Sequence, residues 1–261
     1  MNKDYVAKYA HLEINHWWFI IRQKIILQLL QKYVTGVKNT SYKILNVGAA
    51  GGASSKWLSQ FGEVYSLEYD PAFTESLLAQ NIAVIQGSIT SIPFSNNEFD
   101  LVCAFDVIEH VKDDEKAFAE LQRVCKPAGK ICITVPAYQF LWSRHDNINE
   151  HQRRYTNTCL KKLVSKQSYN KIIYRTYFNT ILFLPIFLVR IIENIFKKNP
   201  DIVKSDFEYY QTSSFINMVL QKIFSVELFL LKFIRLPFGV SLLMLVEKFD
   251  NKLPEQTNYN K

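Results

Sequence analysis

Apolar runs alternate with amphipathic segments between residues 43 and 135, a pattern typical of strands that alternate with helices. Five apolar runs without clear two-residue alternation are predicted to be strands buried on both faces, namely 43–47, 63–67, 82–86, 100–105 and 130–135. Helices are predicted between them over 52–60, 71–80 and 113–124, with the turn K-P-A-G at 126–129 ending the last helix. The pattern predicts an α/β fold with a doubly wound, Rossmann-like sheet.

The segments outside this core follow other patterns. Residues 12–33 are predicted to form one amphipathic helix that begins with the aromatic run H-W-W-F at 16–19. Beyond residue 155, a helix over 156–168 and a strand over 171–178 precede an apolar, helix-like stretch of about 60 residues. A last strand is predicted over 239–247, so we expect a seven-stranded sheet.

These patterns divide the chain into four parts. The predicted parts are an N-terminal helical lid (1–40), an α/β core (41–177), a hydrophobic, basic helical insertion between the last two strands (178–236) and the final strand with a tail (237–261).

Charge is concentrated in the C-terminal part of the chain. Residues 151–261 hold 17 Lys and Arg against 8 Asp and Glu, a net charge of +9, whereas residues 1–150 carry a net charge of −2. A basic region rich in Phe, Ile and Leu indicates either an anionic partner (a membrane surface, a lipid phosphate or nucleic acid) or a solvated basic face. The apolar segment 178–196 is interrupted by Arg190 and Glu193, so we expect a core or interfacial helix there, not a membrane span.

The cysteines and the N-terminus bear on the compartment. Cys103, Cys125, Cys132 and Cys159 have no C-x-x-C spacing, which favours buried free thiols over a disulfide framework or a zinc site. The N-terminus M-N-K-D-Y-V is too polar for a signal peptide. We therefore expect a cytoplasmic protein, with peripheral contact at the inner face of the cytoplasmic membrane as a further expectation.

The stretch I-L-N-V-G-A-A-G-G-A-S-S at 44–55 follows the first predicted strand and indicates a loop that binds a nucleotide cofactor. Counted as G-x-G-x-x-G from Gly48, the loop lacks two of three glycines, whereas G-x-G-x-G spacing matches at Gly48 and Gly52 but not at Ala50. In a doubly wound sheet such a ligand lies at the carboxyl ends of the strands.

The motifs that follow the loop in order carry a resemblance to a known family. They are Y-S-L-E-Y-D, Q-G-S-I-T-S-I-P-F-S-N-N-E-F-D-L-V-C-A-F-D-V-I-E-H-V and L-Q-R-V-C-K-P-A-G-K-I-C-I-T-V-P. Over residues 40–136 the sequence resembles class I S-adenosylmethionine-dependent methyltransferases. The later stretches L-W-S-R-H-D…H-Q-R-R-Y-T (141–156) and L-P-F-G-V-S-L-L (236–243) look like those of a bacterial, type 11/12-like subgroup of this family. Some members of this subgroup resemble enzymes that act on glycolipid or polyprenyl-linked intermediates.

The resemblance implies S-adenosylmethionine as the cofactor and gives roles to residues at the matching positions. The loop would wrap the methionine part, Glu68 would bind the ribose hydroxyls, and Phe105 would offer its backbone to the amino group. The implied cofactor-binding residues are Asn46, Gly48, Ala49, Ala50, Gly52, Glu68, Tyr69, Ser88, Ile89 and Phe105. Asn46, Ala50 and Ser88 depart from the family's usual Asp, Gly and Asp, which puts the strength of cofactor binding in question.

Candidate catalytic residues follow the fourth and fifth predicted strands. Methyl transfer needs alignment of the acceptor and, for some acceptors, a base that removes a proton. The candidate bases are His110, His145 and His151. In F-D-V-I-E-H-V, positions 106, 109 and 110 share one face of a helical turn, and the segment looks like one that holds magnesium in ubiquinone-pathway O-methyltransferases. A magnesium site formed by Asp106, Glu109 and His110 is thus an alternative to the favoured interpretation, in which Glu109 and His110 brace the cofactor loop.

The polar loop W-S-R-H-D-N-I-N-E-H-Q-R-R-Y is expected at the mouth of the site. An Arg pair can hold an anionic group such as phosphate, and the candidate substrate-binding residues are Arg144, Arg153, Arg154 and Tyr155. The alternative is a solvated loop that caps the next helix. Near the N-terminus, His16, Trp17, Trp18, Phe19 and Arg22 are expected either to cover the cofactor, to meet a membrane interface or to pack in the core.

The expected function is O-methylation of an amphipathic or lipid- or glycan-linked small-molecule acceptor. No Asn-Pro-Pro-Tyr-type segment follows the fourth strand, which disfavours nucleic acid as a partner. Two alternatives remain at this point. One is a catalytically weak, membrane-associated binding protein with a cofactor fold, and the other is a nicotinamide-dependent oxidoreductase. The acceptor and the oligomeric state cannot be read from the residues.

Overall fold

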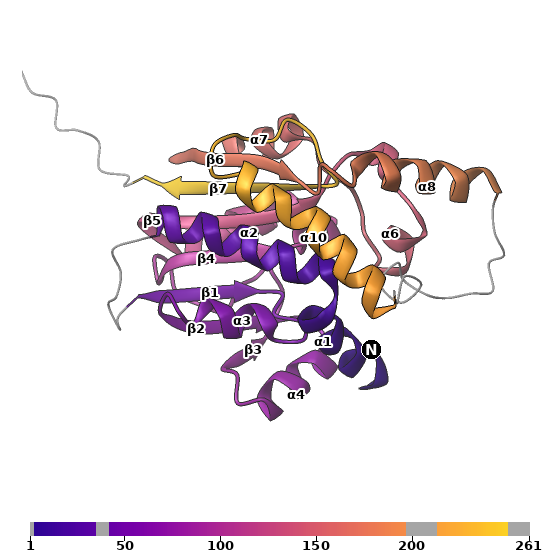
Figure 1. Cartoon of the computed structure of the whole chain (residues 1–261). Coiled ribbons are helices and arrows are strands. Elements are labelled where there is room, and N and C mark those ends of the chain that lie inside the picture. The colour runs from indigo at the N-terminus through magenta and orange to yellow at the C-terminus, as the bar shows by residue number, and fades with distance from the viewer. Residues whose placement is uncertain (1–2, 35–41, 197–212, 250–261) are drawn as a thin grey trace, which may run out of the picture.

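The computed structural model describes residues 3–34, 42–196 and 213–249, and its centre is one seven-stranded sheet (Figure 1). The strand order is β3-β2-β1-β4-β5-β7-β6. The strands are β1 (Lys43–Val47), β2 (Glu63–Glu68), β3 (Val84–Gln86), β4 (Phe99–Phe105), β5 (Cys125–Pro136), β6 (Asn170–Phe178) and β7 (Ser241–Lys248). The predicted fold class, a doubly wound α/β sheet of seven strands, is confirmed.

The first five strands run parallel, and the last strand runs against its neighbours. β7 pairs antiparallel with both β5 and β6, which the apolar pattern alone did not indicate. Its central residues, Leu242–Val246, are almost fully buried, because β7 lies inside the sheet between β5 and β6. A hydrophobic run in β7 is therefore compatible with either direction, since both faces of the strand are covered.

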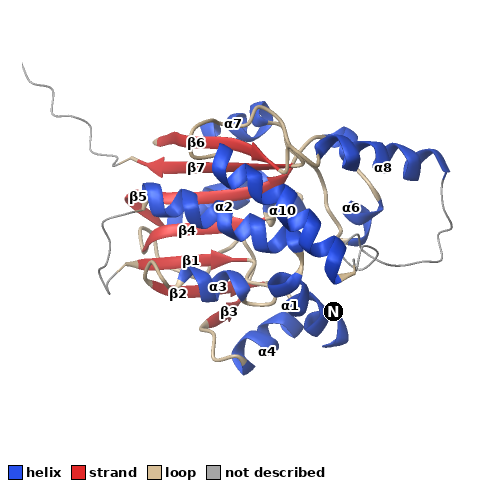
Figure 2. Ribbon diagram, viewed as in Figure 1, coloured by secondary structure: helices blue, strands red, loops and turns tan. Residues whose placement is uncertain are grey.

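Helices cover both faces of the sheet, and each face has its own hydrophobic core (Figure 2). One core packs α5 and α7 against the sheet, and the other packs α2 and α10. The α-helices are α1 (Lys3–Asn15), α2 (Trp17–Tyr33), α3 (Ala53–Leu58), α4 (Pro71–Ala79), α5 (Asp114–Val124), α6 (Arg144–Ile148), α7 (Asn157–Lys166), α8 (Phe183–Phe196) and α10 (Ser214–Leu230). Two 3₁₀ turns, η1 (Ile108–His110) and η2 (Gln139–Leu141), follow β4 and β5.

Local sequence explains where the core helices begin. The Asp70 side chain accepts a hydrogen bond from the backbone N–H of Ala72, and Pro71 occupies the first helical position of α4. Asp113 accepts from the backbone N–H of Lys116 at the start of α5. Both caps satisfy backbone donors that the first helical turn leaves without partners.

The N-terminal segment corrects one prediction. Residues 12–33 do not form a single helix, because the chain breaks at His16 between α1 and α2. His16 caps α2: its Nδ1 accepts from the backbone N–H of Trp18 at 3.3 Å, and its backbone is extended. Burial lowers the pKa of His16 to about 4, so the ring is neutral at neutral pH and can act as an acceptor.

Smaller differences concern strand limits. β3 is two residues shorter at its start than predicted, and the predicted turn at 126–129 lies within β5 as an irregularity, where the register with β4 shifts between Phe99 and Leu101. The predicted polar loop at 142–155 contains the short helix α6. Segments 35–41, 197–212 and 250–261, which include parts of the predicted lid, insertion and tail, lie outside the described residues.

The insertion lies between β6 and β7, as predicted, and its described part consists of α8 and α10. α10 lies beside α2 on one face of the sheet, whereas α8 extends away from the sheet (Figure 1). Among the described residues, none of the helices has the length and apolar character to cross a membrane.

Candidate active site

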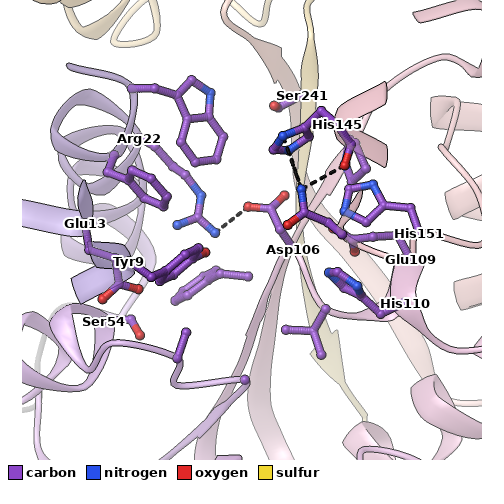
Figure 3. Close-up of a pocket in the computed structure, with 18 of the residues that line it drawn as sticks. Tyr9, Glu13, Arg22, Ser54, Asp106, Glu109, His110, His145, His151 and Ser241 are labelled. Atoms are coloured by element: carbon purple, nitrogen blue, oxygen red, sulfur yellow. Dashed lines mark hydrogen bonds and ion pairs between the residues drawn. The ribbon is translucent and has the colours of Figure 1, made fainter. Parts of the chain in front are cut away.

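One large cavity of about 1310 Å³ opens at the carboxyl ends of the parallel strands. Three groups of elements line it: the loops after β1, β2 and β4, the N-terminal helices α1 and α2, and the segment 145–154 together with α8 and α10. Figure 3 shows the residues of the N-terminal helices on one side and the histidines on the other. Because all of these elements meet at one edge of the sheet, residues far apart in sequence share the cavity.

The turn after β1 has the tight geometry that its glycines predict. Gly48 has φ +71°, and a Cβ on it would lie 2.5 Å from Cγ2 of Val107, so a side chain at this position would be both strained and blocked. Ala50 also has a positive φ, at +45°, although it carries a side chain. The backbone of this turn therefore adopts the shape that a glycine would favour at Ala50.

Glu68 lies at the end of β2 and lines the cavity with only 8% of its surface exposed. Its Oε2 accepts from the backbone N–H of Ala50 at 2.9 Å, and its Oε1 accepts from those of Tyr69 and Asp70 at 2.9 and 3.0 Å. Burial raises the pKa of Glu68, whereas these three hydrogen bonds lower it. One carboxylate thus ties the β1 turn to the β2 turn.

The predicted cofactor-binding residues fall into two groups. Gly48, Ala50, Glu68, Tyr69, Ser88, Ile89 and Phe105 line the cavity. Asn46, Ala49 and Gly52 do not line it, and Asn46 is fully buried behind the loop. The Asn46 amide donates to the hydroxyls of Ser54 and Ser55, both at 2.8 Å, so it supports the start of α3 instead of facing the cavity.

The N-terminal helices contribute cavity residues that sequence reasoning did not single out. Tyr9 and Glu13 of α1 both line the cavity, and Glu13 Oε2 accepts from the backbone N–H of Ala53 at the start of α3. Burial is the main cause that raises the pKa of Glu13 to about 7. A lid was predicted from H-W-W-F, but α1 has no comparable motif that would mark Tyr9 and Glu13.

Arg22 of α2 extends into the cavity and forms an ion pair with Asp106 (Figure 3). Its guanidinium carbon lies 5.0 Å from the ring centre of Trp18 and 5.6 Å from that of Phe105. Asp106 also accepts from the Thr134 hydroxyl at 3.2 Å and has φ +56°. The predicted grouping of Asp106 with Glu109 and His110 on one face is therefore wrong, because Asp106 turns toward Arg22 (Figure 3).

The three candidate catalytic histidines do gather on one side of the cavity. The ring centres of His110 and His151 lie 4.6 Å apart and those of His145 and His151 lie 5.9 Å apart. The backbone N–H of Gln152 donates to the carbonyl of Glu109 at 2.7 Å, which fixes residue 151 beside η1. The sequence predicts each of these histidines separately, and the fold brings them together.

A buried carboxylate organises this side of the cavity. Asp146 is fully buried and accepts from Arg154 through both of its oxygens, at 2.8 and 2.9 Å. Its Oδ1 also lies 2.8 Å from Nδ1 of His151. These partners hold the pKa of Asp146 below its ordinary value although burial alone raises it. Asp146 therefore orients both His151 and Arg154.

The predicted substrate-binding residues have other partners in the structure. Arg154 lines the cavity, but its guanidinium is bound to Asp146, and Arg153 pairs with Asp114 at 2.8 Å. Tyr155 is buried and donates to Asp114 at 2.8 Å. Arg144, Arg153 and Tyr155 do not line the cavity. The prediction of an Arg pair that faces the acceptor is thus corrected, because each guanidinium neutralises a carboxylate of the protein.

Comparison with known proteins agrees with this geometry. Residues 45–133 match a family model described as a methyltransferase domain. The chain is 32% identical over 94 residues to a demethylmenaquinone methyltransferase from Renibacterium salmoninarum, covering 35% of this chain and 40% of that protein. It is 27% identical over 130 residues to a sterol 24-C-methyltransferase from Aspergillus fumigatus, covering 46% and 33%. The matched regions thus span less than half the length of these relatives.

A solved structure of similar fold covers nearly the whole chain. A methyltransferase dependent on S-adenosylmethionine from Archaeoglobus fulgidus superposes with a TM-score of 0.56 at 14% identity, covering 92% of this chain and 99% of that one. A phosphoethanolamine N-methyltransferase from Haemonchus contortus, in complex with S-adenosylmethionine, gives 0.53 at 18% identity, covering 88% and 53%.

Fold and sequence together define the class. A sheet ordered 3-2-1-4-5-7-6 with β7 antiparallel differs from the all-parallel 3-2-1-4-5-6 order of dinucleotide-binding folds, which argues against the nicotinamide alternative. The chain is an α/β protein of the methyltransferase fold. Its residues 45–133 match a methyltransferase domain, in agreement with the resemblance to class I S-adenosylmethionine-dependent methyltransferases.

The residues present fit S-adenosylmethionine, the cofactor of this family. The left-handed turn at Gly48 leaves space where a side chain would stand, and Glu68 faces the cavity with one acceptor position left on its carboxylate. Gly48 and Ala50 would hold the methionine part, Glu68 the ribose, and Ser88 and Ile89 the adenine.

Proposed function

We propose that this protein transfers a methyl group to a hydroxyl oxygen of an amphipathic, lipid- or glycan-linked acceptor. The observation that carries the proposal is that the turn after β1 and three histidines line one cavity, with the histidines opposite Tyr9, Glu13 and Arg22 (Figure 3). When bound, S-adenosylmethionine supplies an activated methyl group on a sulfonium. The protein aligns the acceptor oxygen with this methyl group, excludes water and takes up the hydroxyl proton.

The histidine side of the cavity supports removal of a hydroxyl proton. A neutral imidazole within reach of the acceptor is the usual group for this task. Desolvation and the neighbouring His151 lower the pKa of His110, although its ring is exposed on the cavity wall. His145 also lines the cavity and lies within 3.2 Å of the Asn149 amide through either ring nitrogen.

The outer wall of the cavity supports an apolar acceptor. α8 and α10 line it with residues such as Pro185, Val189, Ile216 and Leu220. Other positions on the same helices expose large apolar side chains, among them Leu184, Leu188, Ile192, Phe215, Val226 and Phe229. Helices that line a cavity with apolar residues and also expose apolar surface are suited to an acceptor with an apolar chain.

C-methylation is the second candidate, and the names of relatives favour it. The sterol methyltransferase and a ubiquinone/menaquinone biosynthesis enzyme from Psychromonas ingrahamii are both C-methyltransferases by name, the latter 32% identical over 69 residues. Both transfers release one proton, from the hydroxyl oxygen or from the methylated carbon, so the three histidines can serve either reaction. We propose oxygen because a hydroxyl can donate a hydrogen bond directly to a neutral imidazole before the transfer.

The proposal is tested by incubating the purified chain with a bacterial lipid extract and ¹³C-methyl-labelled S-adenosylmethionine. We expect a lipid or glycolipid species that gains one labelled methyl group with the ¹³C chemical shift of a methoxy carbon. A shift typical of a methyl group on carbon would replace the O-methyl proposal by the second candidate. No labelled species, in a preparation that binds S-adenosylhomocysteine, would contradict both.

We also propose that the exposed apolar surface of α8 and α10 contacts an anionic membrane from which the acceptor enters. The net charge of +9 over residues 151–261 complements anionic headgroups. Flotation with vesicles that contain anionic phospholipid should carry the protein upward, and Phe215→Asp with Phe229→Asp, both on α10, should abolish this. Leu78→Asp, at an equally exposed position on α4, is the control and should leave flotation unchanged. Wild-type protein that stays at the bottom with anionic vesicles contradicts the proposal.

A further inference from the structure

We propose that Glu109, His110 and His151 form a binding site for a divalent transition-metal ion on the histidine side of the cavity. Each side chain offers one ligand atom, and these atoms all lie within 4.8 Å of one another. Ligands at about 2.0–2.1 Å from a tetrahedral zinc ion would stand about 3.3 Å apart, so small side-chain rotations suffice to close the site.

The state of Glu109 points to a missing partner. Its side chain is fully buried, and neither carboxylate oxygen has a hydrogen-bond partner within the described part of the chain. A buried carboxylate without a partner is costly, and buried charges in proteins are normally paired or bind metals. A divalent cation beside Glu109 would supply the partner that both carboxylate oxygens lack.

Neighbouring groups orient both imidazoles in the way metal-binding histidines require. Asp146 lies 2.8 Å from Nδ1 of His151, which directs that ring's proton to the carboxylate and leaves Nε2 for an ion. His110 interacts with the backbone of Asn149. Metal-binding histidines commonly donate their other ring N–H to a carboxylate or a backbone carbonyl, and the Asp146–Arg154 pair holds this arrangement rigid.

The donor set selects the kind of ion. Two imidazoles with one carboxylate suit Zn²⁺, Fe²⁺ or Mn²⁺, whereas Mg²⁺ prefers oxygen ligands. The set differs from the magnesium set expected from sequence, since His151 from the loop after α6 takes the place of Asp106. Three protein ligands leave further coordination positions for water or substrate.

The suggested role of the ion, though not its binding, rests on the proposed O-methyl transfer. A hydroxyl beside a divalent cation loses its proton more readily. With His110 and His151 bound to the ion, His145 is the candidate histidine that remains to take the proton. The acceptor oxygen then bonds to the methyl carbon as the bond from that carbon to sulfur breaks, and S-adenosylhomocysteine is released.

The test uses the full chain after dialysis against a chelator. Titration calorimetry with Zn²⁺ should give one site per chain, and Co²⁺ should give visible absorption bands of a coordinated ion, whereas Mg²⁺ should give little heat. Glu109→Gln and His151→Asn should each weaken Zn²⁺ affinity by more than about 100-fold, beyond the 10–100-fold typical of residues that only orient a ligand.

Two controls separate metal binding from folding and from catalysis. Glu109→Gln removes a buried unpaired charge, so without metal its melting temperature should equal or exceed that of wild type, while the rise on adding Zn²⁺ is lost. His145→Asn, in the same cluster, should keep Zn²⁺ affinity within about threefold of wild type while losing methyl transfer. No Zn²⁺ or Co²⁺ binding by wild type, preferred binding of Mg²⁺, or equal loss in His145→Asn would each overturn the site. Absence of methyl transfer with metal binding intact would overturn only the proposed function.

Discussion

The two sides of the cavity are built in different ways. The cofactor side consists of consecutive turns after β1 and β2, whose shape depends on backbone conformation at Gly48 and Ala50 and on one carboxylate, Glu68. The histidine side joins η1 to a loop some forty residues later and depends on the buried pair of Asp146 and Arg154. The first side is held by local backbone geometry, and the second is held by contacts between side chains distant in sequence.

This difference predicts opposite outcomes for the loss of one carboxylate on each side. Asp146→Ala leaves the buried Arg154 guanidinium without its carboxylate partner and with a hydrogen bond to the Ala137 carbonyl, so we expect the free energy of unfolding to fall by about 3–5 kcal/mol. Urea unfolding measures the change. Affinity for S-adenosylhomocysteine, measured below the unfolding transition, should change less than about threefold, because Asp146 lies away from the cofactor loop.

The exposed neighbour Glu150 provides the matched control for this variant. Glu150→Ala should alter the unfolding free energy by less than about 0.5 kcal/mol. A loss below about 1 kcal/mol for Asp146→Ala would show that the pair does not hold the histidine side together. The folded state lowers the pKa of Asp146. The Asp146 carboxylate therefore stabilises the folded protein at pH values above its unfolded pKa near 4, and this contribution should be lost as the pH falls below that value.

On the cofactor side, Glu68→Ala should act mainly on binding. The variant removes the acceptor of three backbone N–H groups and the expected partner of the ribose hydroxyls. Hydrogen bonds to a charged group contribute about 1.5–3 kcal/mol each, so the affinity for S-adenosylhomocysteine should fall at least 100-fold. Calorimetry measures this change. Glu63→Ala, at the exposed start of the same strand, should leave affinity unaltered, and an equal loss in both variants would count against a specific role for Glu68.

The cofactor side was predictable from sequence because its determinants are local. A glycine turn after a strand and an acidic residue at the end of the next strand have fixed positions in the fold, so Gly48, Glu68 and Phe105 could be placed in advance. The Asn46 side chain, predicted to bind the cofactor, donates to the serines of α3, a direction that the residues of the strand and turn alone do not indicate.

The histidine side was predictable only as a set of polar residues. The candidates His110, His145 and His151 could be named from the sequence, but the sequence does not indicate which charged side chains form ion pairs with one another. Arg153 and Arg154 were expected to face an acceptor, and they are paired with Asp114 and Asp146 through contacts that only the folded chain creates. A run of charges in a loop therefore does not reveal which of them remain for a ligand.

The α1 helix lies on the cofactor side and gives a pH-dependent prediction. Burial raises the pKa of Glu13 to about 7, above its unfolded value near 4.5, so the folded state binds this proton more tightly. Relative to Glu13→Gln, wild type should lose stability as the pH rises from about 4.5 to about 7, by on the order of 1 kcal/mol because Glu13 is partly exposed. Above pH 7 the difference should stay constant. Urea unfolding of both proteins across this range checks the sign, and parallel curves would contradict it.

The smallest expected effect concerns the alanine at the centre of the cofactor turn. Ala50 lies at φ +45°, where a side chain strains the backbone by about 1–2 kcal/mol. Glycine relieves this strain, but its greater conformational entropy in the unfolded chain offsets part of the stabilisation. Ala50→Gly should therefore raise the unfolding free energy by about 0.5–1 kcal/mol. Affinity for S-adenosylhomocysteine should rise by a few-fold, because a methyl group leaves the cavity wall.

The adjacent Ala49→Gly is the matched control, and its effect should have the opposite sign. Ala49 is fully buried and does not share the positive φ, so glycine there removes a packed methyl group and adds chain entropy without relieving strain. Urea unfolding of the two variants compares the relief of backbone strain at residue 50 with the loss of side-chain packing at residue 49. If Ala50→Gly destabilised the protein as much as Ala49→Gly, side-chain packing would govern the cofactor turn, and the contrast between the two sides of the cavity would not hold there.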